Sequence, residues 1–295
     1  VKTVATWFRG DDRSLALGIM NLAPNIGAVA TPLAVPIIAV AWGWKAAFII
    51  TGALGFVWLA FWFMLPRAAG PAPAPAIAGP ERSLKAFGRL LLDRRSWAIT
   101  AGKFFTDFVW VFLLFWGPDL FNKMYGLETV GLSLPVALVF LMAGIGSLFA
   151  GSLSSWLLAK GRSFNVARKT PMVIAAVLAL PVFAVAWAPN VWVAAGLLGL
   201  TLAAHQMFST SIFGLTTDVF PSRMTGLVIG LAATIAGFSG LAMNEYTGWM
   251  RDNGASFAPM LALCAGAKVI GVIAVHLLVP NVDRARERMI AAEAA

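Results

Sequence analysis

The stretch Trp97 to Phe121, WAITAGKFFTDFVWVFLLFWGPDLF, decides how the rest of the chain is interpreted. It is long and apolar enough to cross a bilayer, yet Lys103 and Asp107 lie inside it. On a helix these two residues share one face, and Trp110 continues that face one turn further. Because a charge in hydrocarbon is costly, such residues usually face a bundle interior or a wet cavity. The stretch therefore predicts a membrane helix that lines a cavity. The alternative is a self-neutralising pair that only holds neighbouring helices together.

The composition is typical of a protein that crosses a membrane several times. Apolar residues make up 60% of the chain, charged residues only 12%, and the mean hydropathy is +0.82. One cysteine, Cys264, excludes an internal disulfide, and two histidines are too few for a Cys/His metal cluster. We therefore expect neither a bound metal nor a cofactor.

Hydropathy and charge together predict the topology. A span needs roughly 20 mostly apolar residues, and the chain offers eight such segments: 14–41, 45–65, 97–121, 130–158, 171–188, 191–217, 224–250 and 257–279. Of the 22 Lys and Arg, 17 fall in one alternating set of loops and three in the other. The positive-inside rule makes the first set cytoplasmic, with both termini of this chain inside. This split accounts for the net charge of +9 without a nucleic-acid partner.

The spans and loops divide the chain into four parts. Residues 1–65 hold two spans, 66–95 form a cytoplasmic linker, 96–280 hold six spans, and 281–295 form a cytoplasmic tail. The linker begins with a segment rich in Pro, Ala and Gly that cannot form a core. Its second part places apolar residues on one face, which predicts a helix lying on the membrane surface or, alternatively, a solvated linker.

The first and seventh spans resemble each other. In both, a glycine follows an arginine by 14 residues: Gly27 follows Arg13, and Gly237 follows Arg223. Internal repeats of this kind are typical of transporters. If spans one and two correspond to spans seven and eight, four further spans are expected before Val1, and the sequence is expected to be a piece of a longer protein.

Two other spans carry polar residues in register. Asn21 and Asn25 lie one turn apart in the first span, and His205 and Ser209 form a stripe in the sixth, with Gln206 beside it. Such side chains are what a polar organic solute requires at mid-membrane depth. The alternative in each case is a residue that only hydrogen-bonds a neighbouring helix, a contribution of about 1 kcal/mol.

Three ionisable residues near or within spans are left outside this site. Asp218 lies at the predicted cytoplasmic end of the sixth span, where we expect it to pair with a loop arginine. Glu245 and Lys268 could pair with each other across helices, or the Lys268 side chain could snorkel to the membrane surface.

These stretches together resemble the major facilitator superfamily and, within it, the anion:cation symporter family with its hexuronate and other sugar-acid transporters. The segments that carry the resemblance are 7–33, 43–58, 103–121 and 204–221. The resemblance implies an all-α membrane protein with the major-facilitator helix bundle. This chain would supply the last two helices of the N-terminal half and all six of the C-terminal half, about eight of twelve.

The resemblance also implies proton-coupled uptake of small organic anions, sugar acids such as hexuronates first, by alternating access. Lys103, or a basic group from the absent half, would attract the carboxylate. The residues implied to line the central cavity are Asn21, Asn25, Lys103, Asp107, Trp110, His205, Gln206 and Ser209. The implied partners are the lipid bilayer, the organic anion and a coupling proton, with a proton or cation gradient in place of a cofactor. We expect a monomer when complete, in the bacterial inner membrane.

The family places its principal cationic anchor and its proton-carrying carboxylate in earlier helices. A second departure is Ser155, where the family usually has an Asp four residues after Gly151.

The alternatives are a symporter of another carboxylate, such as a dicarboxylate or an aromatic acid, and a truncated remnant that transports nothing. An enzyme would need clustered acids, a nucleophile–base pair or metal ligands at one membrane depth. The doublet Asp11-Asp12 stands alone, so we expect no enzyme.

Overall fold

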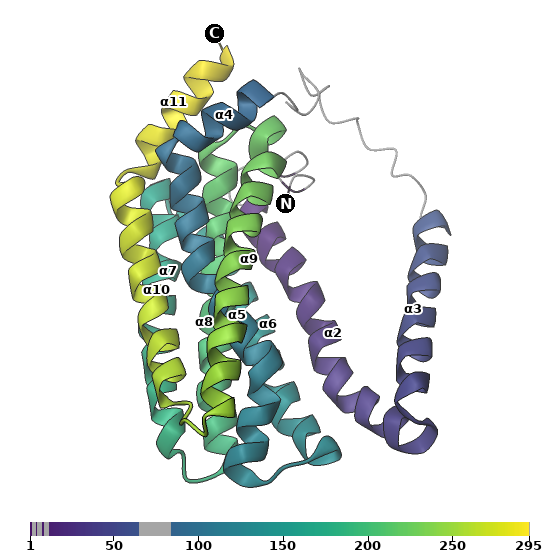
Figure 1. The fold of residues 1–295 in the computed structure, drawn as a ribbon. Coiled ribbons are helices and arrows are strands. Elements are labelled where there is room, and N and C mark those ends of the chain that lie inside the picture. Colours follow the sequence, from purple (N-terminus) through teal and green to yellow (C-terminus); the bar gives the residue numbers. More distant parts are fainter. Residues whose placement is uncertain (2–3, 5–7, 9–11, 65–83, 295) are drawn as a thin grey trace.

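The computed structural model describes residues 1, 4, 8, 12–64 and 84–294, and these residues form helices without any strand (Figure 1). Among the described residues, eight helical segments are long and apolar enough to cross a membrane, which confirms the predicted number of spans. In chain order the elements are α2 (Asp12–Trp42), α3 (Trp44–Met64), α4 (Leu84–Leu92), α5 (Arg94–Tyr125), η1 (Thr129–Leu132), α6 (Ser133–Ala159), α7 (Phe164–Ala179), η2 (Leu180–Trp187), α8 (Val191–Val219), α9 (Ser222–Asp252), α10 (Ala258–Leu278) and α11 (Val282–Ala294).

Helix α8 is the centre of the bundle. Its start is fixed by Asn190, whose side chain accepts hydrogen bonds from the first backbone N–H groups of the helix, and it ends shortly before Pro221. From Thr201 to Val219 every residue except Phe213 is buried. Helices α5, α6 and α7 pack around it. Polar side chains in this part of α8 are therefore enclosed by other helices.

Two apolar clusters stabilise the bundle, and a polar layer lies at their junction on α8. One cluster contains Phe112 and Phe257 with the first turns of α8, and the other contains Ile99 and Phe220 with its later turns. His205 lies where the two clusters meet along α8. Burial of apolar surface on both sides therefore holds this polar layer in place.

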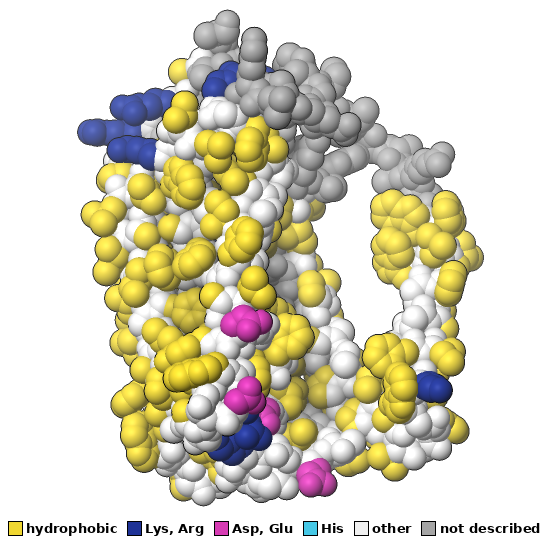
Figure 2. All heavy atoms as spheres, viewed as in Figure 1, with side chains coloured by type: hydrophobic (Ala, Val, Ile, Leu, Met, Phe, Trp, Pro, Cys, Tyr) yellow, Lys and Arg dark blue, Asp and Glu magenta, His cyan; other side chains and the backbone are white. Residues whose placement is uncertain are grey.

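Helices α2 and α3 form an arm that leaves the bundle. Helix α2 packs against α6 and α8 over its first half, and its buried residues end at Asn25. It then diverges from the bundle, and α3 stands apart with Ala47 as its one buried residue (Figure 1). Figure 2 shows apolar side chains gathered toward both ends of α3, with white surface between them. We call the part of the chain from 12 to 64 the α2–α3 arm.

The two ends of the bundle differ in which helices and charged residues lie there. Helices α4 and α11 and both marked chain ends lie at one end, where α2, α5 and α9 begin (Figure 1). We call this the basic end, since it includes Arg94, Arg223 and Arg284. Helix α4 corresponds to the helix predicted within 83–95, whereas the Pro/Ala/Gly segment 70–80 lies outside the described residues.

One predicted boundary was wrong. The fourth span was expected to end at 158 and the fifth to begin at 171. Helix α6 does end at Ala159, but α7 begins at Phe164, behind the N-cap Ser163, whose side chain accepts a hydrogen bond from Val166 N–H. The basic residues Arg168 and Lys169 had suggested a loop, but they lie within this helix. After Ala179 the span continues as the 3-10 segment η2, where Pro181 removes a backbone donor.

Candidate functional site

The structure brings three of the predicted site residues into one hydrogen-bonded chain between α2 and α8. Asn21 Nδ2 donates to Thr210 Oγ1 at 3.0 Å, and Gln206 Nε2 donates to Asn25 Oδ1 at 3.1 Å. Asn25 Nδ2 in turn donates to the Asn21 carbonyl oxygen at 2.7 Å. Amide side chains of this kind retain unused donors and acceptors, so the chain can also hydrogen-bond a ligand.

Helix α6 adds a residue that sequence reasoning missed. Ser147 Oγ donates to the Gly18 carbonyl oxygen at 2.8 Å and lies 3.3 Å from Thr210 Oγ1. The small residues from Gly144 to Gly151 in the fourth span were the available signal, because small residues let membrane helices approach closely and hydrogen-bond across the interface. Ser147 thus joins α6 to the polar contact between α2 and α8.

The face predicted on α5 carries an ion pair. Lys103 Nζ lies 2.8 Å from Asp107 Oδ2, and the two side chains are 12% and 25% exposed. The same Nζ lies 5.5 Å from the centroid of the Phe213 ring on α8. The pair is therefore internally neutralised yet accessible from outside the bundle, the arrangement required for an anion to approach Lys103.

Trp110 and His205 form the aromatic part of the site. Their rings stack with centroids 5.3 Å apart and an interplanar angle of 26°. His205 Nδ1 lies 3.1 Å from the Thr106 carbonyl oxygen, which only accepts, so Nδ1 carries the hydrogen. This contact with α5 is the packing role that was the alternative for His205. It leaves Nε2 of a neutral ring as an acceptor.

Helix α8 connects the two groups of residues. Gln206 on α8 reaches α2, and the adjacent His205 reaches α5. Ser209 lies one turn beyond His205 on the same stripe and is largely buried. All eight residues of the predicted site thus lie on three helices, with α2 and α5 each packed against α8.

Lys268 on α10 is a further charged group close to this site. It is fully buried, so its side chain does not snorkel, and within the described residues its Nζ has no hydrogen-bond partner. Glu245 on α9 is exposed and forms no ion pair with it among the described residues. Lys268 lies within electrostatic reach of Asp107 and His205 instead. The sequence left both residues unassigned, because which face of α10 is buried follows from packing.

Toward the basic end of the bundle, a buried ion pair holds the helices together. Arg168 on α7 pairs with Asp218 on α8 and also donates to Ser14 Oγ on α2. Both charged side chains are only 2% exposed. Asp218 does pair with an arginine, as expected, but that arginine belongs to a helix and not to a loop. Arg13 Nη1 adds a bond from the start of α2 to the Thr217 carbonyl oxygen at 3.1 Å.

Comparison with known proteins identifies relatives over nearly the whole chain. The Escherichia coli (strain K12) hexuronate transporter is 26% identical over 301 residues, covering 95% of this chain and 68% of the relative. A D-galactonate transporter of Escherichia coli O6:H1 is 25% identical over 307 residues, covering 96% and 70%. The Bacillus subtilis (strain 168) hexuronate transporter is 25% identical over 284 residues, covering 93% and 67%. All three are named as transporters, which supports the expectation that this chain is not an enzyme.

Solved structures give the same fold. A bacterial homologue of the human lysosomal transporter Spinster, in an inward-facing and occupied conformation, superposes with a TM-score of 0.54. It covers 98% of this chain and 72% of its own, at 16% identity, and at that identity the likeness concerns the fold alone. The family model described as Major Facilitator Superfamily matches residues 1–243. The chain is thus a multi-pass integral membrane protein, and it belongs to the Major Facilitator Superfamily.

Proposed function

We propose that this chain is part of a secondary transporter that carries sugar acids, such as hexuronates and hexonates, across the bacterial inner membrane. The observation that carries the proposal is the partly exposed Lys103–Asp107 pair beside the hydrogen-bonding chain of α2 and α8. A sugar acid has one carboxylate and several hydroxyls, and the site offers one accessible cation and several neutral donors and acceptors. The names of the relatives agree with this chemistry.

Each part of such a substrate has a matching group. The carboxylate competes with Asp107 for Lys103. The hydroxyls bind the amides of Asn25 and Gln206, whose mutual hydrogen bond a ligand can replace. The apolar face of the sugar ring lies against an aromatic ring, as is usual for ring-shaped polar ligands in pockets, and Trp110 supplies that ring.

The same pair suggests how a proton gradient drives uptake. Protonation of Asp107 breaks its ion pair and leaves Lys103 to the substrate carboxylate, so proton and anion binding favour each other. Lys103 pairs with this carboxylate, and Lys268 lies within electrostatic reach of it. Because two reciprocal binding events are linked at one residue, we propose a symport of proton and anion.

The position of the α2–α3 arm supports a proposal for alternating access. At the basic end Arg168, Ser14 and Asp218 tie α2 to the bundle, and α2 diverges toward the opposite end. We propose that the basic end faces the cytoplasm, as the distribution of Lys and Arg predicts, and that transport requires α2 to separate from α6 there.

The test combines binding and uptake. Wild type, Lys103→Gln and the control Lys160→Gln, whose side chain is exposed at the end of α6, are purified and reconstituted into proteoliposomes. Binding of labelled glucuronate and galactonate is measured, and uptake is measured with and without an inward proton gradient. Loss of a charge-assisted contact should weaken binding by Lys103→Gln about 10- to 100-fold, whereas Lys160→Gln should bind like wild type.

A second candidate, transport of another carboxylate, is tested in the same vesicles. A dicarboxylate or an aromatic acid uses the same Lys103 but fewer hydroxyl contacts. Binding of those acids with no binding of the sugar acids would replace the first proposal. Equal binding of sugar acids by wild type and Lys103→Gln would refute the role of the ion pair.

A further inference from the structure

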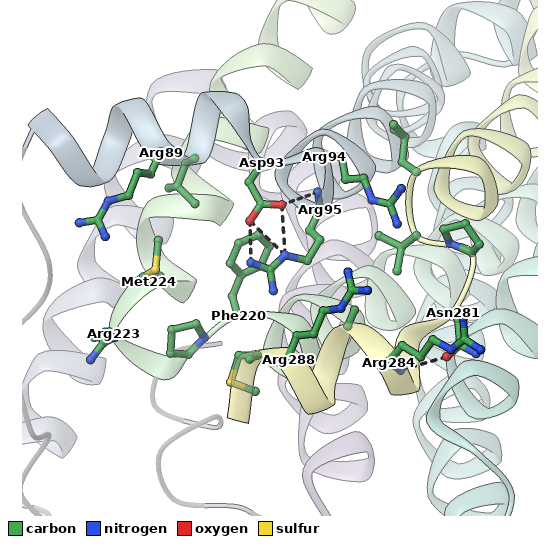
Figure 3. Close-up of a pocket in the computed structure, with 17 residues that line it drawn as sticks. Arg89, Asp93, Arg94, Arg95, Phe220, Arg223, Met224, Asn281, Arg284 and Arg288 are labelled. Atoms are coloured by element: carbon green, nitrogen blue, oxygen red, sulfur yellow. Dashed lines mark hydrogen bonds and ion pairs between the residues drawn. The ribbon is translucent and has the colours of Figure 1, made fainter. Parts of the chain in front are cut away.

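A pocket of about 600 Å³ lies at the basic end, well away from the Lys103 site. It is enclosed by α4, the first turn of α5, the α8–α9 junction, the end of α10 and the start of α11 (Figure 3). Arg95 in its wall precedes Lys103 by eight residues, or about two turns of α5. Any ligand bound here is therefore separate from the proposed substrate, and the inference does not depend on the proposed function.

Charge is the distinguishing property of this pocket. Its lining includes six arginines: Arg89, Arg94, Arg95, Arg223, Arg284 and Arg288. Asp93 is the one acidic residue among the described residues that line it, and Arg95 already binds it at 2.7 Å. The six arginines come from four helices and line one pocket. Like charges near one another repel, and an anion in the pocket would reduce that repulsion.

One of these arginines has an unused donor. The Nε of Arg223 is buried, and within the described residues it has no hydrogen-bond partner. A buried donor without an acceptor destabilises the folded state by about 1–3 kcal/mol, so such a group marks a place where an acceptor is expected. An anion in the pocket would provide it.

The rest of the lining indicates what kind of anion fits. Guanidinium groups match the oxygens of phosphate in a bidentate geometry. The same pocket also has apolar walls, among them Leu90, Met224 and Leu278. It lies where the spanning helices α5, α9 and α10 begin or end, which is the depth of lipid headgroups. Basic pockets between membrane helices at this depth suit phosphorylated headgroups.

We propose that this pocket binds a phosphate group, and that the phosphate is carried by the headgroup of an anionic phospholipid whose acyl chains continue along the apolar walls. Bound there, the lipid joins α4, α5, α9 and α11, the four helices that supply the arginines of the pocket. A soluble phosphate uses the same arginines but leaves the apolar walls uncovered, and this difference separates the two sources.

The experiment compares variants of the 295-residue chain in detergent. Arg284→Gln/Arg288→Gln removes two pocket cations on exposed positions of α11. The control, Arg286→Gln, removes one positive charge from the same helix, where the guanidinium lies over Phe164 outside the pocket lining. Each protein is titrated with fluorescent phosphatidylglycerol, with fluorescent phosphatidylcholine, and with phosphatidylglycerol in the presence of inorganic phosphate.

We expect wild type and Arg286→Gln to prefer phosphatidylglycerol over phosphatidylcholine, and the double variant to bind phosphatidylglycerol about tenfold or more weakly. If inorganic phosphate does not displace phosphatidylglycerol from wild type, the site is assigned to a lipid. If it does displace the lipid from wild type and no longer does so in the double variant, the site is assigned to soluble phosphate. Arg284→Lys/Arg288→Lys should keep most of the binding, because it keeps the charge. Equal binding by the double variant and Arg286→Gln, with equal melting temperatures, would overturn the proposal.

Discussion

Arg168 connects three helices through a single side chain. Its guanidinium pairs with Asp218 on α8 and donates to Ser14 on α2, and all three side chains are nearly inaccessible. Gly214 on α8 makes room for the guanidinium, since a Cβ there would lie 2.9 Å from it. At the scale of one residue, removal of the Arg168 guanidinium would affect the packing of three helices at once.

We predict that Arg168→Gln lowers the stability of the protein by about 3–5 kcal/mol, because it leaves Asp218 buried without its counter-charge. Thermal unfolding in detergent, followed by tryptophan fluorescence, measures the effect. Arg162→Gln is the control, since that side chain is exposed between α6 and α7. The apolar pair Arg168→Met/Asp218→Leu should recover part of the loss. A Tm of Arg168→Gln equal to that of the control would show that the ion pair contributes nothing.

At the scale of elements, α2 and α6 pack closely against each other toward the basic end. The two helices meet through glycines: a Cβ on Gly151 would lie 2.8 Å from the Ser14 carbonyl oxygen and 3.0 Å from the Gly18 Cα. Backbones this close allow Ser147 to hydrogen-bond the Gly18 carbonyl. The contact therefore depends on the absence of side chains at these positions.

Gly151→Ala should separate α2 from α6 and destabilise the protein by about 1–3 kcal/mol, the usual consequence of overpacking. Gly52→Ala on α3 is the matched control, because a Cβ there meets nothing within 4 Å. Melting curves give the stability, and cysteines placed at Ala16 and Ser152 report the helix separation by spin-label distances. An unchanged distance together with an unchanged Tm would mean that the helices adjust without separating.

At the scale of the whole molecule, the loops alternate between two ends, and both marked chain ends lie at the basic one (Figure 1). We predict that a cysteine introduced by Glu287→Cys reacts with a membrane-impermeant maleimide only in inverted vesicles. Asn253→Cys, exposed at the opposite end, should react only in intact cells. The native Cys264 is buried and serves as the unlabelled background. The reverse labelling pattern would invert the proposed orientation.

The sequence predicted the features that depend on residues close together in the chain, and not those that depend on contacts between distant residues. The eight spans were predicted because apolar length is a local property, and the Lys103–Asp107 pair because its spacing is one helical turn. The partners Ser147 and Arg168 could not be assigned, because each acts on residues more than 40 positions away. The burial of Lys268 likewise depends on which helices surround α10, and the sequence does not specify that.

Because α3 stands apart from the bundle, its tilt depends on the thickness of the bilayer. Nearly every face of this 21-residue helix is exposed among the described residues, including Phe56, Phe63 and Met64. Its length of about 32 Å matches an ordinary hydrocarbon core. In a thinner membrane it must tilt, and since it joins α2 through Gly43, whose φ is +82°, that tilt would pull on the contact between α2 and α6. Lipid chain length should therefore act on this protein through mechanical strain.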